Sequence, residues 1–162
     1  YELPRWLQID FSATVQAYAE EQESEVQSEA IHDLFQRTYL APDGRWTLGD
    51  YQLSRADHVD QLTIVLNEGS HAHQITGTGN GVVAAFVDAM ERFTGKPIVL
   101  VEYNEHALSQ SADAEAVCYI QLNVDGERVC GVGRSHDIVQ ASMNGILGAL
   151  NRAATTAAVA AA

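Results

Sequence analysis

The feature that most constrains the fold of this chain is an internal repeat. Three strand-like segments are followed by a helical segment, and the same order then recurs further along the chain. A Gly-x-Gly triplet precedes each helical segment, at residues 77–79 and again at 131–133. A single unit of this kind would leave one face of a three-stranded sheet exposed, which is only marginally stable. The sequence therefore predicts an α+β fold in which two βββα units pack together with pseudo-twofold symmetry.

The first unit is predicted to cover residues 45–95. Apolar alternation and turn residues predict its strands at 46–54, 59–67 and 71–76. Apolar residues at helical spacing predict a helix at 82–90, which Gly95 and Pro97 end.

The second unit is predicted to cover residues 96–153. Its strands are expected at 98–107, 116–124 and 128–133, with a hairpin turn at 125–126 and a helix from 137 to about 152. Residues 84–90 of the first helix then correspond to residues 141–147 of the second, because small side chains occupy matching places.

The part before the repeats, residues 1–44, is predicted to be a helical linker subdomain. Helix-like apolar spacing occurs at 3–19 and at 31–40, around an acidic connection at 20–28. The Pro42-Asp43-Gly44 turn closes this part.

After the second unit, residues 154–162 are rich in alanine and have no polar face, so we expect a tail. That ending, together with a first residue, Tyr1, that is not methionine, predicts an excised segment.

The charge balance excludes some classes of partner. Lys and Arg number 9 against 22 Asp and Glu, a formal net charge of -13, so nucleic acid and anionic membrane surfaces are repelled. The chain has no apolar run near the roughly 18 residues of a membrane span, and no signal peptide. We therefore expect a cytoplasmic protein. Cys118 and Cys130 lack metal-ligand spacing and are expected to be buried, reduced thiols.

The strongest candidate binding site is the glycine-rich junction at 77–81, between a strand and a helix. Glycine lets the backbone approach a ligand, and the free N–H groups of a helix start suit a carboxylate or a phosphate. The same glycines can serve a turn that needs positive φ and nothing more. Their spacing does not complete the G-x-G-x-x-G fingerprint of dinucleotide-binding domains.

Other polar residues give weaker indications of chemistry. Glu105 and His106 could form a general base and its partner, but neighbouring residues on a strand point to opposite faces. His71 and His73 alternate on a strand and could bind a metal, yet no third ligand has suitable spacing. The sequence has no nucleophile motif. We therefore expect no catalytic residue and no metal site, and a catalytic role for Glu105, His106 or Asp113 is the least favoured hypothesis.

Small residues close to Asp113 suit a different kind of site. A pocket for a free amino acid needs donors for the carboxylate, an acceptor for the ammonium group and room for the side chain. Alanines leave such room, and they occur at positions 107, 112, 114 and 116.

Several motifs, in the same order, resemble the C-terminal part of the 2-isopropylmalate synthase family. They are residues 3–12 (LPRWLQIDFS), Gly79-Asn80-Gly81, 103–107 (YNEHA), 113–116 (DAEA), 131–133 (GVG) and 149–152 (ALNR). The similarity covers nearly the whole chain. It implies the second helical subdomain of that enzyme up to about residue 42, and a leucine-sensing regulatory domain over about 45–152.

The resemblance also implies a function. In that family a metal-containing (β/α)8 barrel condenses acetyl-CoA with 2-oxoisovalerate, and leucine inhibits the enzyme at its C-terminal domain. For this segment it implies a homodimer that binds leucine, contacts the catalytic barrel, and carries no cofactor of its own. The residues that match or adjoin the leucine pocket of the family are Gly79, Asn80, Gly81, Ala84, Tyr103, Ala107, Ala114, Ala116, Ser135 and His136.

Two alternatives stay open. The chain could be the regulatory domain of a related citramalate or homocitrate synthase, which senses another amino acid, or a purely structural dimerisation module. Val82 stands where the family usually has proline, and the loop at 134–136 is variable in the family. Both departures leave the affinity and identity of the effector open.

Overall fold

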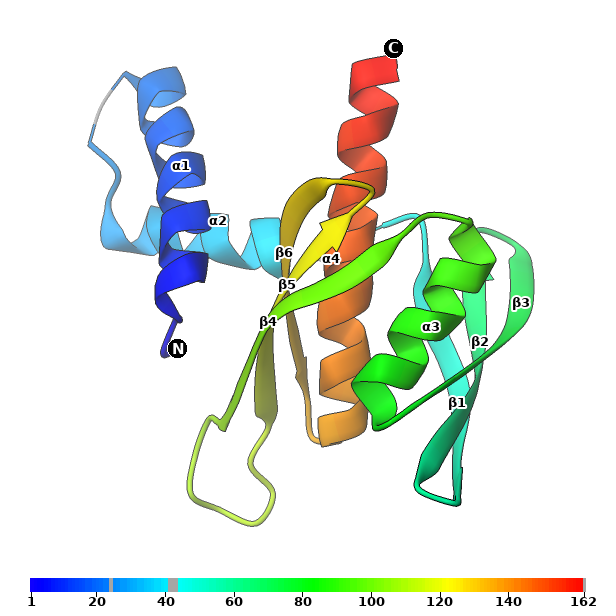
Figure 1. The fold of residues 1–162 in the computed structure, drawn as a ribbon. Coiled ribbons are helices and arrows are strands. Elements are labelled where there is room, and N and C mark those ends of the chain that lie inside the picture. The colour runs from blue at the N-terminus through cyan, green and yellow to red at the C-terminus, as the bar shows by residue number, and fades with distance from the viewer. Residues whose placement is uncertain (24, 41–43, 162) are drawn as a thin grey trace.

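The computed structural model describes residues 1–23, 25–40 and 44–161, with side chains described up to Ala154. Two N-terminal helices precede two βββα units, which confirms the predicted α+β fold (Figure 1). The elements are α1 (Arg5–Gln22), α2 (Ser28–Tyr39), β1 (Thr47–Ala56), β2 (Val59–Glu68), β3 (His71–Gly79), α3 (Val82–Thr94), β4 (Ile98–Ala107), β5 (Ala116–Val124), β6 (Glu127–Ser135) and α4 (Ile138–Ala161).

Each unit forms its own antiparallel sheet, with strand order β1-β2-β3 in the first and β4-β5-β6 in the second. The registers match: Leu62 pairs with Gly77 in the first sheet, and Ile120 pairs with Gly131 at the same place in the second. The edge strands β1 and β4 each carry a register shift near their beginning. The repeat inferred from the sequence therefore extends to the pairing of individual residues in the two sheets.

The main core lies where the two units meet. Helices α3 and α4 lie side by side between the sheets (Figure 1). Fully buried side chains from both central strands and both helices form one cluster, and each such side chain stabilises the fold by about 1.5–3 kcal/mol. They include Leu62, Ile64, Phe86, Met90, Ile120, Leu122 and Ile146.

The two sheets differ on their outer faces. Strand β2 alternates buried and exposed residues, so the outer face of its sheet is open to solvent. Strand β5 is buried at every position from Val117 to Leu122, because α1 and α2 pack on the outer face of its sheet (Figure 1). The second core formed there consists of Leu7, Phe11, Leu34, Phe35, Tyr39, Val117, Tyr119, Cys130 and Val132.

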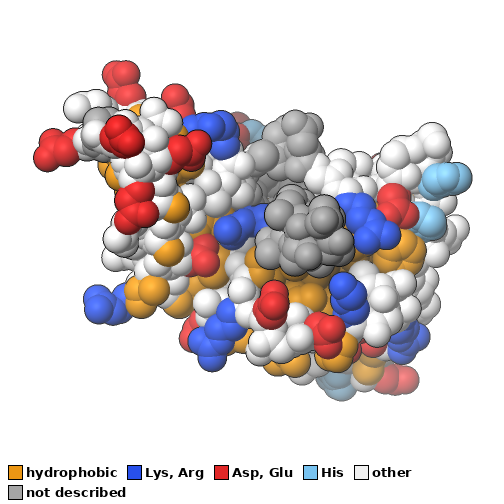
Figure 2. All heavy atoms as spheres, turned by 90° about the horizontal axis from the view of Figure 1, so that it is seen from above, with side chains coloured by type: hydrophobic (Ala, Val, Ile, Leu, Met, Phe, Trp, Pro, Cys, Tyr) orange, Lys and Arg blue, Asp and Glu red, His pale blue; other side chains and the backbone are white. Residues whose placement is uncertain are grey.

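The N-terminal helices carry much of the negative charge. Seen from above, acidic side chains gather over α1 and α2 (Figure 2). The exposed acidic residues described between residues 1 and 40 are Glu2, Glu20, Glu21, Glu23, Glu25, Glu29 and Asp33.

Gly77 and Gly79 do not serve a positive-φ turn, which was the alternative to ligand binding in the sequence. Both lie inside β3 and pair with β2, and only Gly81 has a positive φ, of 113°. A Cβ on Gly77 would lie 2.1 Å from the carbonyl oxygen of Ala85, so α3 crosses the strand at a distance that excludes any side chain. Gly131 is in the same position, with its Cβ 2.1 Å from the carbonyl oxygen of Gly145. The repeated glycines are therefore explained by close helix packing.

These contacts also correct the predicted alignment of the two helices. Gly77 approaches Ala85 and Gly131 approaches Gly145, so these two helical residues are equivalent. The sequence alignment placed Ser142 opposite Ala85, three residues away. Counted back from these equivalent residues, the first residue of α4 lies about one helical turn further away than the first residue of α3.

Some predicted boundaries also change. Helix α1 extends to Gln22 and α2 begins at Ser28, so the predicted connection at 20–28 is shorter. Helix α4 continues to Ala161, so residues 154–161 of the predicted alanine-rich tail are helical. Pro42 and Asp43 of the predicted turn lie outside the described residues. Within the described ranges, no helix is both long and apolar enough to cross a membrane.

Candidate functional site

The ten residues predicted to line or adjoin an effector site lie in three places. These are the β3–α3 junction, the β6–α4 junction, and the region from β4 through the β4–β5 connection to the start of β5. Figure 1 shows both junctions and the β4–β5 connection toward the end of the molecule where α3 and α4 begin. The fold thus brings segments that are far apart in the sequence to one end of the paired units.

The β3–α3 junction offers backbone donors. Gly81 directly precedes α3, accepts a hydrogen bond from the Ala85 N–H at 3.0 Å, and has open space where a side chain would be. No side chain caps the N-terminus of α3. The N–H groups of the first turn are then suited to an anion such as a carboxylate. Ala84, in that turn, is exposed and leaves the approach unobstructed.

A row of small side chains crosses the second sheet. Ala107 pairs with Ala116, and Ala116 pairs with Ser135 on the next strand. Residues paired in this way point to the same face of a sheet. This face is the one on which Tyr103 and α4 lie, because Tyr103 precedes Ala107 by an even number of residues and contacts α4. The row leaves space for an aliphatic group.

Tyr103 closes one side of this surface. Its hydroxyl group donates a hydrogen bond to the Glu105 carboxylate at 2.6 Å and lies 2.8 Å from Ser142 Oγ. Burial, and then the hydrogen bond to Glu105, raise the pKa of Tyr103 above its ordinary value. The ring is therefore neutral and held in place by two elements.

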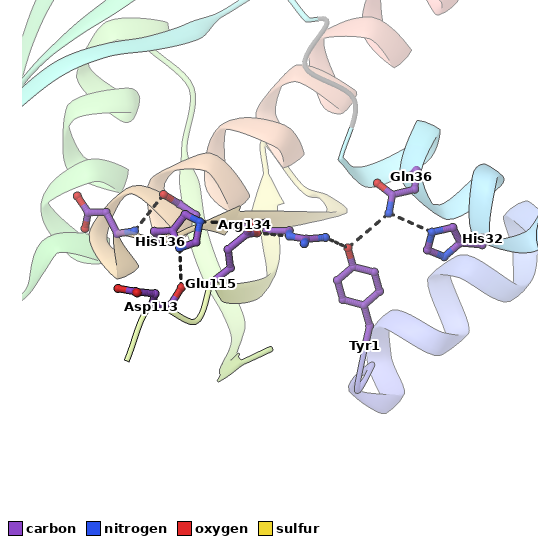
Figure 3. A network of polar contacts seen from close by, with 9 residues as sticks. Tyr1, His32, Gln36, Asp113, Glu115, Arg134 and His136 are labelled. Atoms are coloured by element: carbon purple, nitrogen blue, oxygen red, sulfur yellow. Dashed lines mark hydrogen bonds and ion pairs between the residues drawn. The ribbon is translucent and has the colours of Figure 1, made fainter. Parts of the chain in front are cut away.

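A polar network holds the β4–β5 connection against the β6–α4 junction (Figure 3). Arg134 forms an ion pair with Glu115, which lowers the pKa of that carboxyl group. His136 Nδ1 donates to the Asp113 carbonyl oxygen at 2.8 Å, and its Nε2 lies 3.6 Å from Glu115. Ala114 and His136 of the predicted site are both positioned by this network, and the sequence analysis did not anticipate the role of Glu115.

The structure separates Glu105 from His106, as predicted for neighbours on a strand. Glu105 accepts from Tyr103 on the α4 side, whereas His106 contacts the Tyr119 hydroxyl group at 2.8 Å on the side of the N-terminal helices. His106 Nδ1 lies 3.2 Å from the Ala107 carbonyl oxygen, to which it can only donate. Both ring nitrogens thus have partners within the fold, which is a structural role.

Of the two alternating histidines on β3, His73 has structural partners. His73 contacts Glu68 at 3.2 Å and packs against Phe93. Over the described residues, no three His, Cys, Asp or Glu side chains gather as a metal site. Cys118 and Cys130 are buried and unpaired, as predicted.

Two sizeable cavities found in the described part lie elsewhere. One of about 520 Å³ lies between α2, β1, β6 and α4, and one of about 450 Å³ lies between the end of α3 and α4. None of the ten predicted residues lines either cavity. The predicted effector site is therefore an open surface in a single chain.

Comparison with known proteins identifies the family. Residues 25–154 match the LeuA allosteric (dimerisation) domain family. The chain belongs to this family. The match to the LeuA allosteric domain includes α2 and both βββα units, while α1 precedes it.

Similar curated proteins are named 2-isopropylmalate synthase. The synthase of Leifsonia xyli subsp. xyli is 40% identical over 167 residues, covering 97% of this chain and 28% of that protein. The synthase of Thermobifida fusca is 37% identical, covering 94% and 27%, and that of Brucella melitensis biotype 1 is 33% identical, covering 93% and 28%. The chain thus spans about 28% of the length of the curated relatives it matches.

Proposed function

We propose that this LeuA allosteric domain binds leucine and mediates dimerisation and feedback inhibition of a 2-isopropylmalate synthase. The observation that carries the proposal is the match of residues 25–154 to an allosteric domain, together with similarity to synthases over nearly the whole chain. The condensation of acetyl-CoA with 2-oxoisovalerate, and the divalent metal it uses, belong in this proposal to a barrel elsewhere in the synthase. This segment then has no turnover of its own.

The chemistry of the open surface suits a free aliphatic amino acid. The carboxylate is bound by N–H groups at the start of α3, next to Gly81. The isobutyl group lies against the small side chains of Ala84, Ala107 and Ala116, which set the size that fits. The exposed carboxylate of Glu105 is an acceptor for the ammonium group.

A second copy of the chain completes the site in this proposal. The surface is open in one chain, and large apolar side chains remain exposed on the paired units, with Val59 at 47%, Val99 at 59% and Ile138 at 43% exposure. Leucine inhibits if it binds the less active packing of the two copies more tightly. A coupling of about 1–3 kcal/mol is typical of such systems.

Calorimetry on this chain tests the effector. We expect heat of binding with leucine and much less with valine. Stronger binding of isoleucine than of leucine would indicate the domain of a related synthase, and no binding of any of the three at millimolar concentration would overturn the proposal.

A variant separates an effector site from a purely structural module. Gly81→Leu is a poor choice, because a side chain at a φ of 113° is strained whether or not a ligand binds. Ala84→Leu, on the exposed start of α3, should abolish leucine binding and leave the melting temperature nearly unchanged. Ala13→Leu, on the exposed side of α1, is the matched control and should leave binding intact.

One observation favours the purely structural alternative. Gly77 and Gly131 are explained by the packing of α3 and α4, so these glycines do not require a ligand. If the module is purely structural, the Ala84→Leu and Ala13→Leu variants behave alike, because leucine binds to neither variant and not to the unaltered chain.

A further inference from the structure

The N-terminal segment attaches to the second unit through an apolar core and polar contacts. Trp6 Nε1 of α1 donates to Asn104 Oδ1 of β4 at 3.3 Å, and two further polar contacts lie along β6. The first of these two lies beside β6, where Tyr39 donates to Asp10, and Arg152 lies 3.5 Å from the same carboxylate. The second lies at the end of β6, where Arg134 Nη1 donates to the Tyr1 hydroxyl group at 2.8 Å. Of the two contacts along β6, only the second adjoins the predicted effector residues Ser135 and His136, while the Trp6 contact lies beside Tyr103.

Arg134 connects two parts of the molecule at once (Figure 3). Its guanidinium group pairs with Glu115, directly before β5, and also reaches the Tyr1 hydroxyl group, with the Tyr1 ring centroid 6.0 Å away. The Tyr1 ring in turn packs on Phe35 of α2, with ring centroids 5.2 Å apart. A displacement of Arg134 therefore alters its contact with Tyr1 and, through Tyr1, the packing against α2.

Glu115 carries the connection on to the effector surface. Its other carboxylate oxygen lies 3.6 Å from His136, and His136 is hydrogen-bonded to the backbone of Asp113. Ala114 and Ala116 flank Glu115 in the chain. A ligand that orders this surface therefore changes the position of the carboxylate that holds Arg134.

Space beside this connection permits movement. The cavity of about 520 Å³ is lined by Arg134 and Glu115 on one side and by Gln36 and Leu40 of the helical segment on the other. Side chains that border this space can change position without displacing the close-packed core.

We propose that Arg134 is a positioning residue that couples occupancy of the effector surface to the position of α1 and α2. The inference rests on the proposed function, since it takes leucine as the ligand of that surface. Coupling is reciprocal, so helices that are displaced must also change the effector surface. Arg134 thereby provides a physical connection from the regulatory units to the segment that precedes them.

Hydrogen exchange measured with and without leucine tests this coupling. In the unaltered chain, leucine should change exchange in α1 by about 5-fold, the lower end of typical allosteric coupling. In Arg134→Gln, leucine should still bind, but exchange in α1 should no longer respond. Arg128→Gln, also exposed on β6, is the matched control and should keep the response. A response retained in Arg134→Gln, or absent from the unaltered chain when it binds leucine, overturns the inference and leaves the proposed function standing.

A second measurement needs no effector. Tyr1→Phe removes only the hydroxyl group that Arg134 contacts, and should raise exchange around residues 113–116. Tyr39→Phe removes the hydroxyl group of the distant polar contact, and should not. If leucine fails to bind but this difference appears, the proposed function fails and the connection through Arg134 stands. Equal exchange in the two variants overturns the inference whatever leucine does.

Discussion

The hydroxyl oxygen of Tyr103 on β4 lies 2.8 Å from the hydroxyl oxygen of Ser142 on α4. The Cys118 thiol lies 3.6 Å from both oxygens, so an edge strand, a central strand and a helix meet at one polar cluster. Ser142 is 2% exposed, and water cannot replace the partners of a group so deeply buried. The cluster fixes β4 against α4 where the predicted effector surface begins.

We expect Ser142→Ala to lower the free energy of unfolding by about 1–3 kcal/mol, because Tyr103 then loses a buried hydrogen-bond partner. Urea unfolding followed by circular dichroism measures the change. Ser109→Ala, in the exposed β4–β5 connection, is the control and should change the stability by less than about 0.5 kcal/mol. A similar loss in both variants would show that the cluster does not stabilise the fold.

Two glycine substitutions distinguish close packing from backbone strain. A Cβ at Gly131 would lie 2.1 Å from a backbone oxygen of α4, so Gly131→Ala must displace the helix and should cost about 3 kcal/mol or more. Gly126 has a φ of 91° and open space around it, so Gly126→Ala should cost only about 1–2 kcal/mol. Thermal unfolding compares them, and an equal cost would contradict the packing explanation.

Local sequence patterns predicted the helices and strands well. They did not predict which distant residues contact one another. The strands at 98–107 and 116–124 have the predicted bounds, because apolar patterning and turns determine them. The run of apolar residues in β5 is typical of a strand covered on both faces, but nothing local says that α1 and α2 provide the cover.

The candidate site shows the same limit. Gly77 looked like a turn residue because a glycine required by a close helix and one required by positive φ are identical in a sequence. The contacts of Arg134 with Glu115 and Tyr1 span 19 and 133 residues of sequence, and no spacing rule relates residues so far apart.

The buried Cys130 thiol predicts a loss of stability at alkaline pH. Burial raises its pKa from 9.0 to about 12, so the folded state holds the proton more tightly than the unfolded state. This contribution to stability is complete below pH 9 and is lost as the pH rises toward 12. Urea midpoints should fall over this window. Cys130→Ala should reduce the slope of stability against pH, and an unchanged slope would show that other groups dominate.

The surface around Ile138 is where we expect a second copy of the chain to pack. Ile138 at the start of α4 is 43% exposed and lies two residues from His136, at the end of the molecule where the effector surface is expected. If a second copy covers this end, sedimentation should give twice the chain mass of 17.6 kDa, and Ile138→Glu should weaken the dimer at least about 10-fold because it buries a charge. The control variant is Ile9→Glu on α1, where Ile9 is 63% exposed, and it should leave the dimer intact.

Because the proposed site lies between the copies, Ile138→Glu should also weaken leucine binding at low protein concentration. Binding should recover as the protein concentration rises. A monomeric variant that binds leucine normally would place the whole site within one chain.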